Sequence, residues 1–330
     1  MAKGRFLWLG GASPFFLSQR TGRWKGKWIL LSWIAVIAGF AVAALILFGV
    51  GELISPGSVS EFMESEFCPT DPLGLILALL ATGALFWTPA IFATLVQGRP
   101  IKSLVVPAQN FRWTVVYKAL VLFVLVTTVV SVLIAAAKAI GLGPSNPAAI
   151  SFEGIGAAHA IWLIPVLIAT LVQTSGEDVL FKGLLLRQLG AVTRLFWVAP
   201  LLISASFTAL HIGNPDLEQN LVLVLIPFVL SELSIIGLLM WTGGMEIPLV
   251  AHWVNNTYVT LFLAERGTQS NELTIFVSEQ LGDVDAVSVD QWNLFWFAIF
   301  IVLIVAGIVW NRSPFYVARY TWQTPTELTP

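Results

Sequence analysis

The sequence predicts an all-α fold, a polytopic membrane bundle of about eight transmembrane helices. Three observations carry this prediction: 57% of the 330 residues are hydrophobic, only 11% are charged, and the mean hydropathy is +0.84. Soluble domains are nearer to one quarter charged, so the composition excludes a water-soluble globular enzyme and a disordered protein. A net charge of -2 without a basic patch also excludes a nucleic-acid partner.

Apolar stretches suited to crossing a bilayer recur along the whole chain. A helix needs about 20 mostly apolar residues to cross the hydrocarbon core. The stretches that we expect to span the membrane are 28–51, 73–97, 114–140, 157–189, 195–212, 220–242, 247–264 and 292–311. The fourth stretch is longer than a bilayer requires, so we expect it to protrude.

The expected spans divide the chain into four parts, and the loop charges give their orientation. Residues 1–27 form a basic segment, 28–140 hold three helices, 157–264 hold four, and 292–330 hold the last helix and a tail. Short cytoplasmic loops retain Lys and Arg. With both termini in the cytoplasm, 14 of the 17 basic residues lie on that side and 14 of the 19 acidic residues lie on the other. In the longest outer loop, 265–291, apolar residues at helical spacing favour an interfacial helix that includes Phe276 and Val277.

Few ionisable residues fall inside the expected spans, and each is a candidate for function because an ionised group is costly in a bilayer. In the fourth stretch, Asp178 and Lys182 are four residues apart, the spacing of a helical ion pair that neutralises itself. Glu177 is turned by about 100° from Asp178 and has no cation on its own helix face. We therefore expect Glu177 to act as a general base, with a protonated structural glutamate as the alternative.

Polar residues in two further stretches complete the set of candidates. His211 ends the fifth stretch, and His252 lies four residues before Asn256 in the seventh, so these two share a helix face. A lone histidine in an apolar helix is usually structural, but two of them with an Asn and an unpaired Glu favour a site. Glu232 in the sixth stretch lines the same region or is simply a buried glutamate.

The candidates lie at one depth only if the hairpin that turns near 190–194 projects from the membrane. Arg187 and Arg194 favour such a tip on the cytoplasmic side. Glu177, His211 and His252 would then meet in the cytoplasmic half of the bilayer.

Three short motifs on successive expected helices resemble, in order and spacing, the motifs of the CPBP family. They are Glu177-Asp178-x-x-x-Lys182, Phe207-x-x-x-His211 and His252-x-x-x-Asn256. The family patterns are Glu-Glu-x-x-x-Arg, Phe-x-x-x-His and His-x-x-x-Asn. The CPBP family contains intramembrane glutamic endopeptidases, among them the CAAX prenyl proteases, and Abi-like bacteriocin-processing or immunity proteins. The resemblance covers 157–264, which is therefore expected to be the protease core.

The resemblance implies a role for each matching residue. Glu177 would activate the attacking water, His211 would assist it, and His252 with Asn256 would hold the oxyanion. Such a set is sufficient for peptide hydrolysis without a cofactor.

Two positions depart from the family pattern. Asp178 replaces the second Glu and Lys182 replaces Arg, so the charges are kept but Lys cannot make a bidentate fork to a carboxylate. We expect Asp178, Lys182 and Phe207 to support the catalytic residues, with the Asp178–Lys182 pair mainly structural.

The sequence thus predicts an intramembrane endopeptidase that hydrolyses a membrane-associated peptide or protein by glutamate-activated water. Its partners would be membrane lipid and that substrate, and its location a bacterial inner membrane with both termini cytoplasmic. One alternative is a zinc protease with His211, His252 and Glu177 as ligands. Others are a non-catalytic immunity or scaffold protein and a small-molecule or ion transporter that uses Glu177 and Glu232.

Overall fold

The architecture comes from a computed structural model of the whole chain, and several segments of it are described. The described residues are 23, 26–54, 72–105, 111–139, 150–152, 154–193, 197–211, 221–265 and 273–278. The last expected span at 292–311, its tail to residue 330 and residues 1–22 of the basic segment lie outside them.

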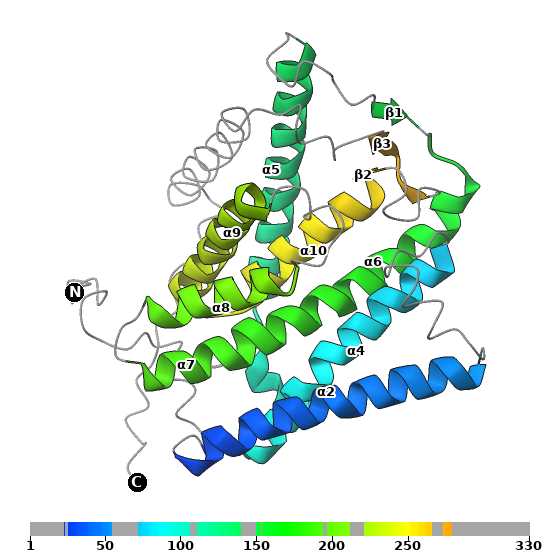
Figure 1. The fold of residues 1–330 in the computed structure, drawn as a ribbon. Coiled ribbons are helices and arrows are strands. Elements are labelled where there is room, and N and C mark those ends of the chain that lie inside the picture. Colours follow the sequence, from blue (N-terminus) through cyan, green and yellow to red (C-terminus); the bar gives the residue numbers. More distant parts are fainter. Residues whose placement is uncertain are drawn as a thin grey trace, which may run out of the picture.

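The described chain is nearly all helical, which confirms the predicted class (Figure 1). Its helices are α2 (Lys27–Ile54), α4 (Pro72–Val96), α5 (Trp113–Ala139), α6 (Ala157–Asp178), α7 (Leu186–Val192), α8 (Val198–Ala209), α9 (Leu221–Thr242) and α10 (Glu246–Leu261). A short 3₁₀ helix, η2 (Ile101–Leu104), follows α4, and a π-helix, η3 (Val179–Leu185), joins α6 to α7.

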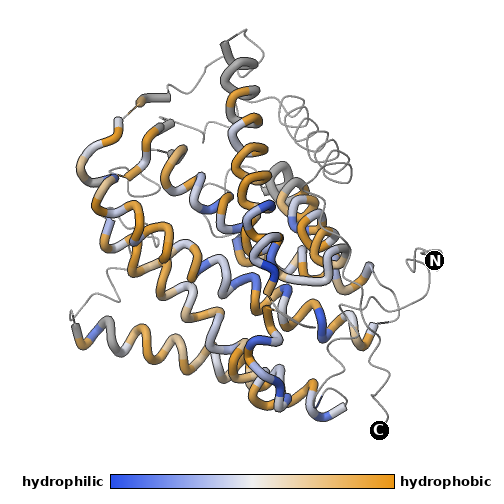
Figure 2. Tube along the Cα trace, turned by 180° about the vertical axis from the view of Figure 1, so that it is seen from behind, coloured by the Kyte–Doolittle hydropathy of each residue, from blue (hydrophilic) through white to orange (hydrophobic). Residues whose placement is uncertain are grey.

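Three helical stretches among the described residues are long and apolar enough to cross a membrane: Lys27–Gly49 in α2, Pro72–Val96 in α4, and His159–Val192, which runs through α6, η3 and α7. Shorter apolar helices cover Trp113–Val129, Val198–Ala209 and Phe228–Met240. Large apolar side chains on α2 are exposed, with Leu45 74% exposed, as expected for contact with lipid. Figure 2 shows that hydrophobic residues predominate along the described helices. The chain is an integral membrane protein of the helical, polytopic kind. The number of eight spans stays a prediction.

Strands appear where the sequence predicted none. β3 (Phe276–Ser278) pairs antiparallel with β1 (Ile150–Phe152) and parallel with β2 (Leu263–Glu265). The expected interfacial helix is therefore wrong at Phe276 and Val277. A short apolar run carries no periodicity that separates helix from strand, and here two neighbouring segments offer backbone partners on both sides of β3.

Close backbone contacts hold the long helices together. α2 packs on α4, and α4 packs on α6, so that the three lie side by side (Figure 1). At the second contact, a Cβ on Gly176 would come within 2.7 Å of the Gly83 carbonyl oxygen. Seven residues further along, a Cβ on Gly183 would meet the Leu104 carbonyl oxygen of η2 at 2.5 Å. Glycine at these positions allows α4 and η2 to lie directly against the α6–η3 backbone.

The end of the long helix is packed into the protein. Arg187 is fully buried, and its Nη1 donates to the Ser103 carbonyl oxygen at 2.6 Å and the Gly183 carbonyl oxygen at 3.1 Å. Arg187 is therefore not an exposed residue of the expected tip, because η2 covers it, and the projection of the hairpin near 190–194 stays a prediction. The sequence distance of 84 residues between these partners gives no local signal of the contact. Arg194 lies outside the described residues.

Candidate active site

The site is built on the continuous helix formed by α6, η3 and α7. Glu177 and Asp178 are the last residues of α6, and Lys182 lies in η3. The π-helical hydrogen bond from the Leu186 N–H to the Phe181 carbonyl oxygen marks the end of η3. π-Helical turns are rare overall, but those that occur often lie at functional sites. They change the direction in which side chains leave the helix.

Glu177 is buried, and its two carboxylate oxygens differ in their partners. Gln173, one turn earlier on α6, donates from Nε2 to Glu177 Oε1 at 2.5 Å. Glu177 Oε2 lies 3.4 Å from His252 Nε2 on α10 and accepts no hydrogen bond from the described residues. Oε2 is thus the oxygen that remains available for chemistry.

His252 connects the two adjacent acids of α6. Its Nδ1 lies 3.2 Å from Asp178 Oδ1, while its Nε2 faces Glu177. Asp178 is paired with Lys182 and is therefore ionised, so that it can only accept, and Nδ1 of His252 carries the proton. The Nε2 of His252 therefore faces Glu177 Oε2 with its lone pair when the imidazole is neutral and with an N–H when it is protonated.

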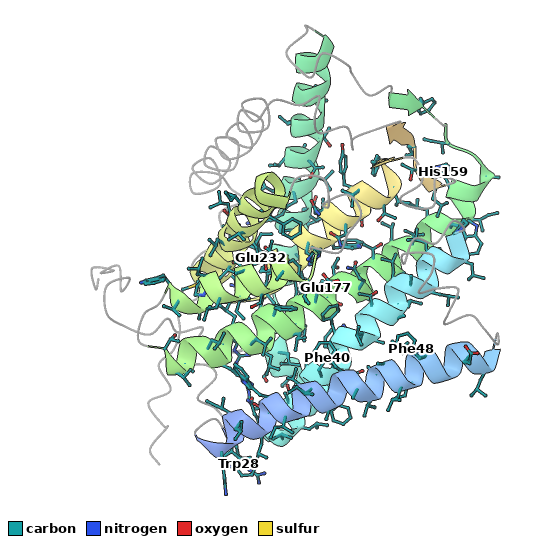
Figure 3. All side chains as sticks on the ribbon, viewed as in Figure 1. Trp28, Phe40, Phe48, His159, Glu177 and Glu232 are labelled. Carbon is teal, nitrogen blue, oxygen red and sulfur yellow. The ribbon has the colours of Figure 1, made fainter. Side chains whose placement is uncertain are left out.

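Lys182 is fully buried and joins three elements. Its Nζ lies 2.5 Å from Asp178 Oδ1 and 2.6 Å from Glu232 Oε1 on α9. It also lies 4.9 Å from the centre of the Phe207 ring on α8. The expected Asp178–Lys182 pair is thus present, but within a group of three charges. Figure 3 shows Glu177 and Glu232 near each other in the interior, and His159 at the far end of α6.

Phe207 brings the second histidine to the group. The rings of His211 and His252 lie 4.8 Å and 5.7 Å from the Phe207 ring, measured between centres. Nδ1 of His211 is 2.8 Å from the Phe207 carbonyl oxygen, which can only accept. His211 therefore carries its proton on Nδ1 when neutral, and its Nε2 is the basic nitrogen.

Asn256 completes the arrangement from α10. Its Nδ2 donates to Gln173 Oε1 at 3.2 Å, and Gln173 in turn donates to Glu177. An amide nitrogen has two N–H groups, so one remains after the bond to Gln173. Asn256 is thus linked to Glu177 through one intermediate side chain.

All seven residues named by the three motifs lie in this one region of α6, η3, α8 and α10. They are Glu177, Asp178, Lys182, Phe207, His211, His252 and Asn256. Sequence reasoning missed Gln173, although its position four residues before Glu177 in an apolar helix was a usable signal. Glu232 was noted, but its partner on another helix could not be read from the sequence.

Metal binding was the main alternative for these residues. Among the described residues, no group of three or more His, Cys, Asp or Glu side chains is arranged to hold a metal ion. His211, His252 and Glu177 therefore do not form a ready ligand set within the described part of the chain.

The fold and the site together define a helical membrane protein with a buried carboxylate–histidine centre. Residues 159–258 match the family model described as type II CAAX prenyl endopeptidase Rce1-like, in agreement with the CPBP resemblance of the three motifs. The chain is also similar to the uncharacterized protein YyaK of Bacillus subtilis (strain 168), with 24% identity over 289 residues, 87% of this chain and 90% of YyaK. No solved structure matches it. The matched segment contains all seven residues of the three motifs.

Proposed function

We propose that this chain is a glutamic intramembrane endopeptidase that cleaves a membrane-associated peptide or protein. One observation carries the proposal: Glu177 Oε2, which accepts no hydrogen bond from the described residues, lies 3.4 Å from His252 Nε2. A carboxylate and an imidazole at this distance can take a proton from water and stabilise the charges that form. Glu177 lies within residues 159–258, the segment that matches the Rce1-like family, and this agrees with the role.

Water attack follows from the proton positions. With Nδ1 of His252 bonded to Asp178, the active state has ionised Glu177 beside protonated His252. Glu177 Oε2 then takes a proton from a water molecule while the oxygen of that water attacks the carbonyl carbon of the substrate. The same proton passes to the leaving amine as the C–N bond breaks.

The oxyanion of the intermediate needs donors that are already in position. The Nε2–H of protonated His252 and the second N–H of Asn256 supply two of them, in keeping with the family pattern. His211, across the Phe207 ring, assists proton transfer through its basic Nε2.

Replacement of the base tests the proposal. Glu177→Gln keeps the shape of the side chain but removes its basicity, so cleavage of a prenylated CAAX peptide in lipid nanodiscs should stop while the folded yield stays unchanged. Glu246→Gln is the matched control, because Glu246 is equally buried but pairs with Arg112 at the start of α10. If Glu177→Gln cleaves at the wild-type rate, the site is wrongly assigned.

The metal alternative has a separate measurement. Cleavage by the purified protein should be unaffected by a chelator, and elemental analysis should find no stoichiometric zinc. Tightly bound zinc whose removal stops cleavage would make His211, His252 and Glu177 metal ligands instead.

A further inference from the structure

Glu232 pairs with a residue of the first motif but belongs to none of the three motifs itself. It lies on α9, its side chain is 5% exposed, and its Oε1 is 2.6 Å from Lys182 Nζ. The proposed mechanism gives Glu232 no direct task. Its burial beside a buried cation requires an explanation, because each ionised group is costly to remove from water.

The geometry of the ammonium group shows how Glu232 fits. Lys182 Nζ donates a hydrogen bond to Asp178 Oδ1 at 2.5 Å, forms an ion pair with Glu232 Oε1 at 2.6 Å and lies over the Phe207 ring. A compact ammonium can serve two carboxylates in different directions, whereas the planar guanidinium of Arg prefers a single bidentate partner. Lysine at this position therefore suits a second carboxylate.

The second carboxylate changes what Asp178 can do. Asp178 Oδ1 is shared between Lys182 at 2.5 Å and His252 Nδ1 at 3.2 Å. The positive charge of Lys182 opposes the attraction between Asp178 and a proton on His252, and the negative charge of Glu232 offsets part of that opposing potential. Glu232 thus lets the negative charge of Asp178 act more strongly on His252.

We propose that Glu232 is a positioning residue, which acts through Lys182 and Asp178 to hold His252 in the orientation and protonation that face Glu177. This inference rests on the proposed function for its catalytic consequence. The four contacts Glu232–Lys182, Lys182–Asp178, Asp178–His252 and His252–Glu177 form one continuous path from α9 to the base.

A spectroscopic test is independent of any substrate. The chain has three histidines, so ¹⁵N-histidine spectra of the full-length protein in nanodiscs can be assigned with His159→Gln and His211→Gln variants. In Glu232→Gln, the His252 Nδ1 signal should move toward that of an imidazole without a carboxylate acceptor. In the double variant Glu232→Gln with Lys182→Met, Asp178 is free of the cation, and the signal should move back.

A kinetic test shows the effect on the reaction. With the prenylated CAAX peptide, Glu232→Gln should lower kcat by roughly 10- to 100-fold, with KM changed less than about threefold. Glu232→Asp, which keeps the charge, should recover part of kcat. Glu246→Gln breaks another buried Glu ion pair and should lower thermal stability without moving the His252 signal or kcat.

Two outcomes would overturn the inference. The first is a His252 signal that is the same in the wild type and in Glu232→Gln. The second is a double variant whose signal lies no closer to the wild type than that of the single variant. If Glu232→Gln does not fold, the comparison of Glu232→Asp and the double variant with the wild type decides in the same way. Failure of Glu177→Gln to stop cleavage would reject the proposed function but leave the spectroscopic result standing.

Discussion

Gln173 makes the two oxygens of Glu177 unequal. Its amide nitrogen donates to Glu177 Oε1 at 2.5 Å, and its amide oxygen accepts from Asn256 at 3.2 Å. Both ends of the side chain are used, so its orientation is fixed. A base held in this way keeps one oxygen toward the substrate and loses less freedom when water binds.

The role of Gln173 leads to a prediction about rate. Gln173→Leu keeps the apolar bulk but removes the donor to Oε1, so kcat should fall by about 10-fold or more while the protein still folds. Cleavage of the prenylated CAAX peptide measures this change.

Gln188 on α7 gives the matched control for Gln173. It is equally buried and bonds to Trp33 and Ser32, away from Glu177. Gln188→Leu should lower the thermal stability in detergent and leave kcat of the remaining folded protein unchanged. Equal loss of kcat in both variants would mean that Gln173 is structural.

The three motifs predicted which residues lie in one region. They could not predict which of those side chains contact each other. Glu177 and His252 are 75 positions apart, and their meeting depends on the packing of α10 against α6. The Asp178–Lys182 pair was predictable because both residues lie on one helix. The Lys182–Glu232 pair was not, because α9 had to be placed in space first.

Besides the three strands, the π-helix η3 is an element that the sequence did not reveal. The pattern 157–189 predicted one long helix, and a continuous helix is present, but its seven residues Val179–Leu185 have π-helical hydrogen bonding. Hydrophobic periodicity cannot locate such a segment inside a helix that is apolar on all sides. Close glycine contacts lie on both sides of Glu177 and Asp178, at Gly176 against α4 and at Gly183 against η2.

These contacts predict the effect of adding a methyl group. Gly176→Ala would place Cβ 2.7 Å from the Gly83 carbonyl oxygen, which is backbone and cannot move aside cheaply. The change should cost about 1–3 kcal/mol of stability, as overpacking does, and should disturb Glu177 next to it. Thermal unfolding in detergent and the cleavage rate measure the two effects.

Gly237 on α9 is the control for this experiment. A Cβ there would meet no atom within 4 Å, and Ala is favoured over Gly within a helix. Gly237→Ala should therefore leave stability unchanged or raise it. A Gly176→Ala variant as stable and active as Gly237→Ala would show that the α4–α6 contact can relax.

Across the whole molecule, three basic segments meet at one end. The Arg23 N–H donates to the Gln97 carbonyl oxygen at 2.9 Å, and Arg187 donates to the Ser103 carbonyl oxygen at 2.6 Å. The start of α2, the segment after α4 and the end of the long helix therefore lie together, as the prediction from loop charges requires. The three strands lie at the opposite end (Figure 1). The cytoplasmic side of the basic end remains a prediction from charge alone.

Labelling of single cysteines tests this orientation. In a Cys68→Ser background, Lys102→Cys reports on the basic end and Ile155→Cys, where the side chain is 73% exposed, reports on the strand end. In right-side-out vesicles, a membrane-impermeant maleimide should label Ile155→Cys at once, and Lys102→Cys only after permeabilisation, because retained Lys and Arg keep that end in the cytoplasm. Ser60→Cys, in the loop between the first two expected spans, should label like Ile155→Cys. Labelling of Lys102→Cys and Ile155→Cys from the same side would contradict the spanning arrangement itself, whereas the reverse pattern would invert the orientation and put both termini outside.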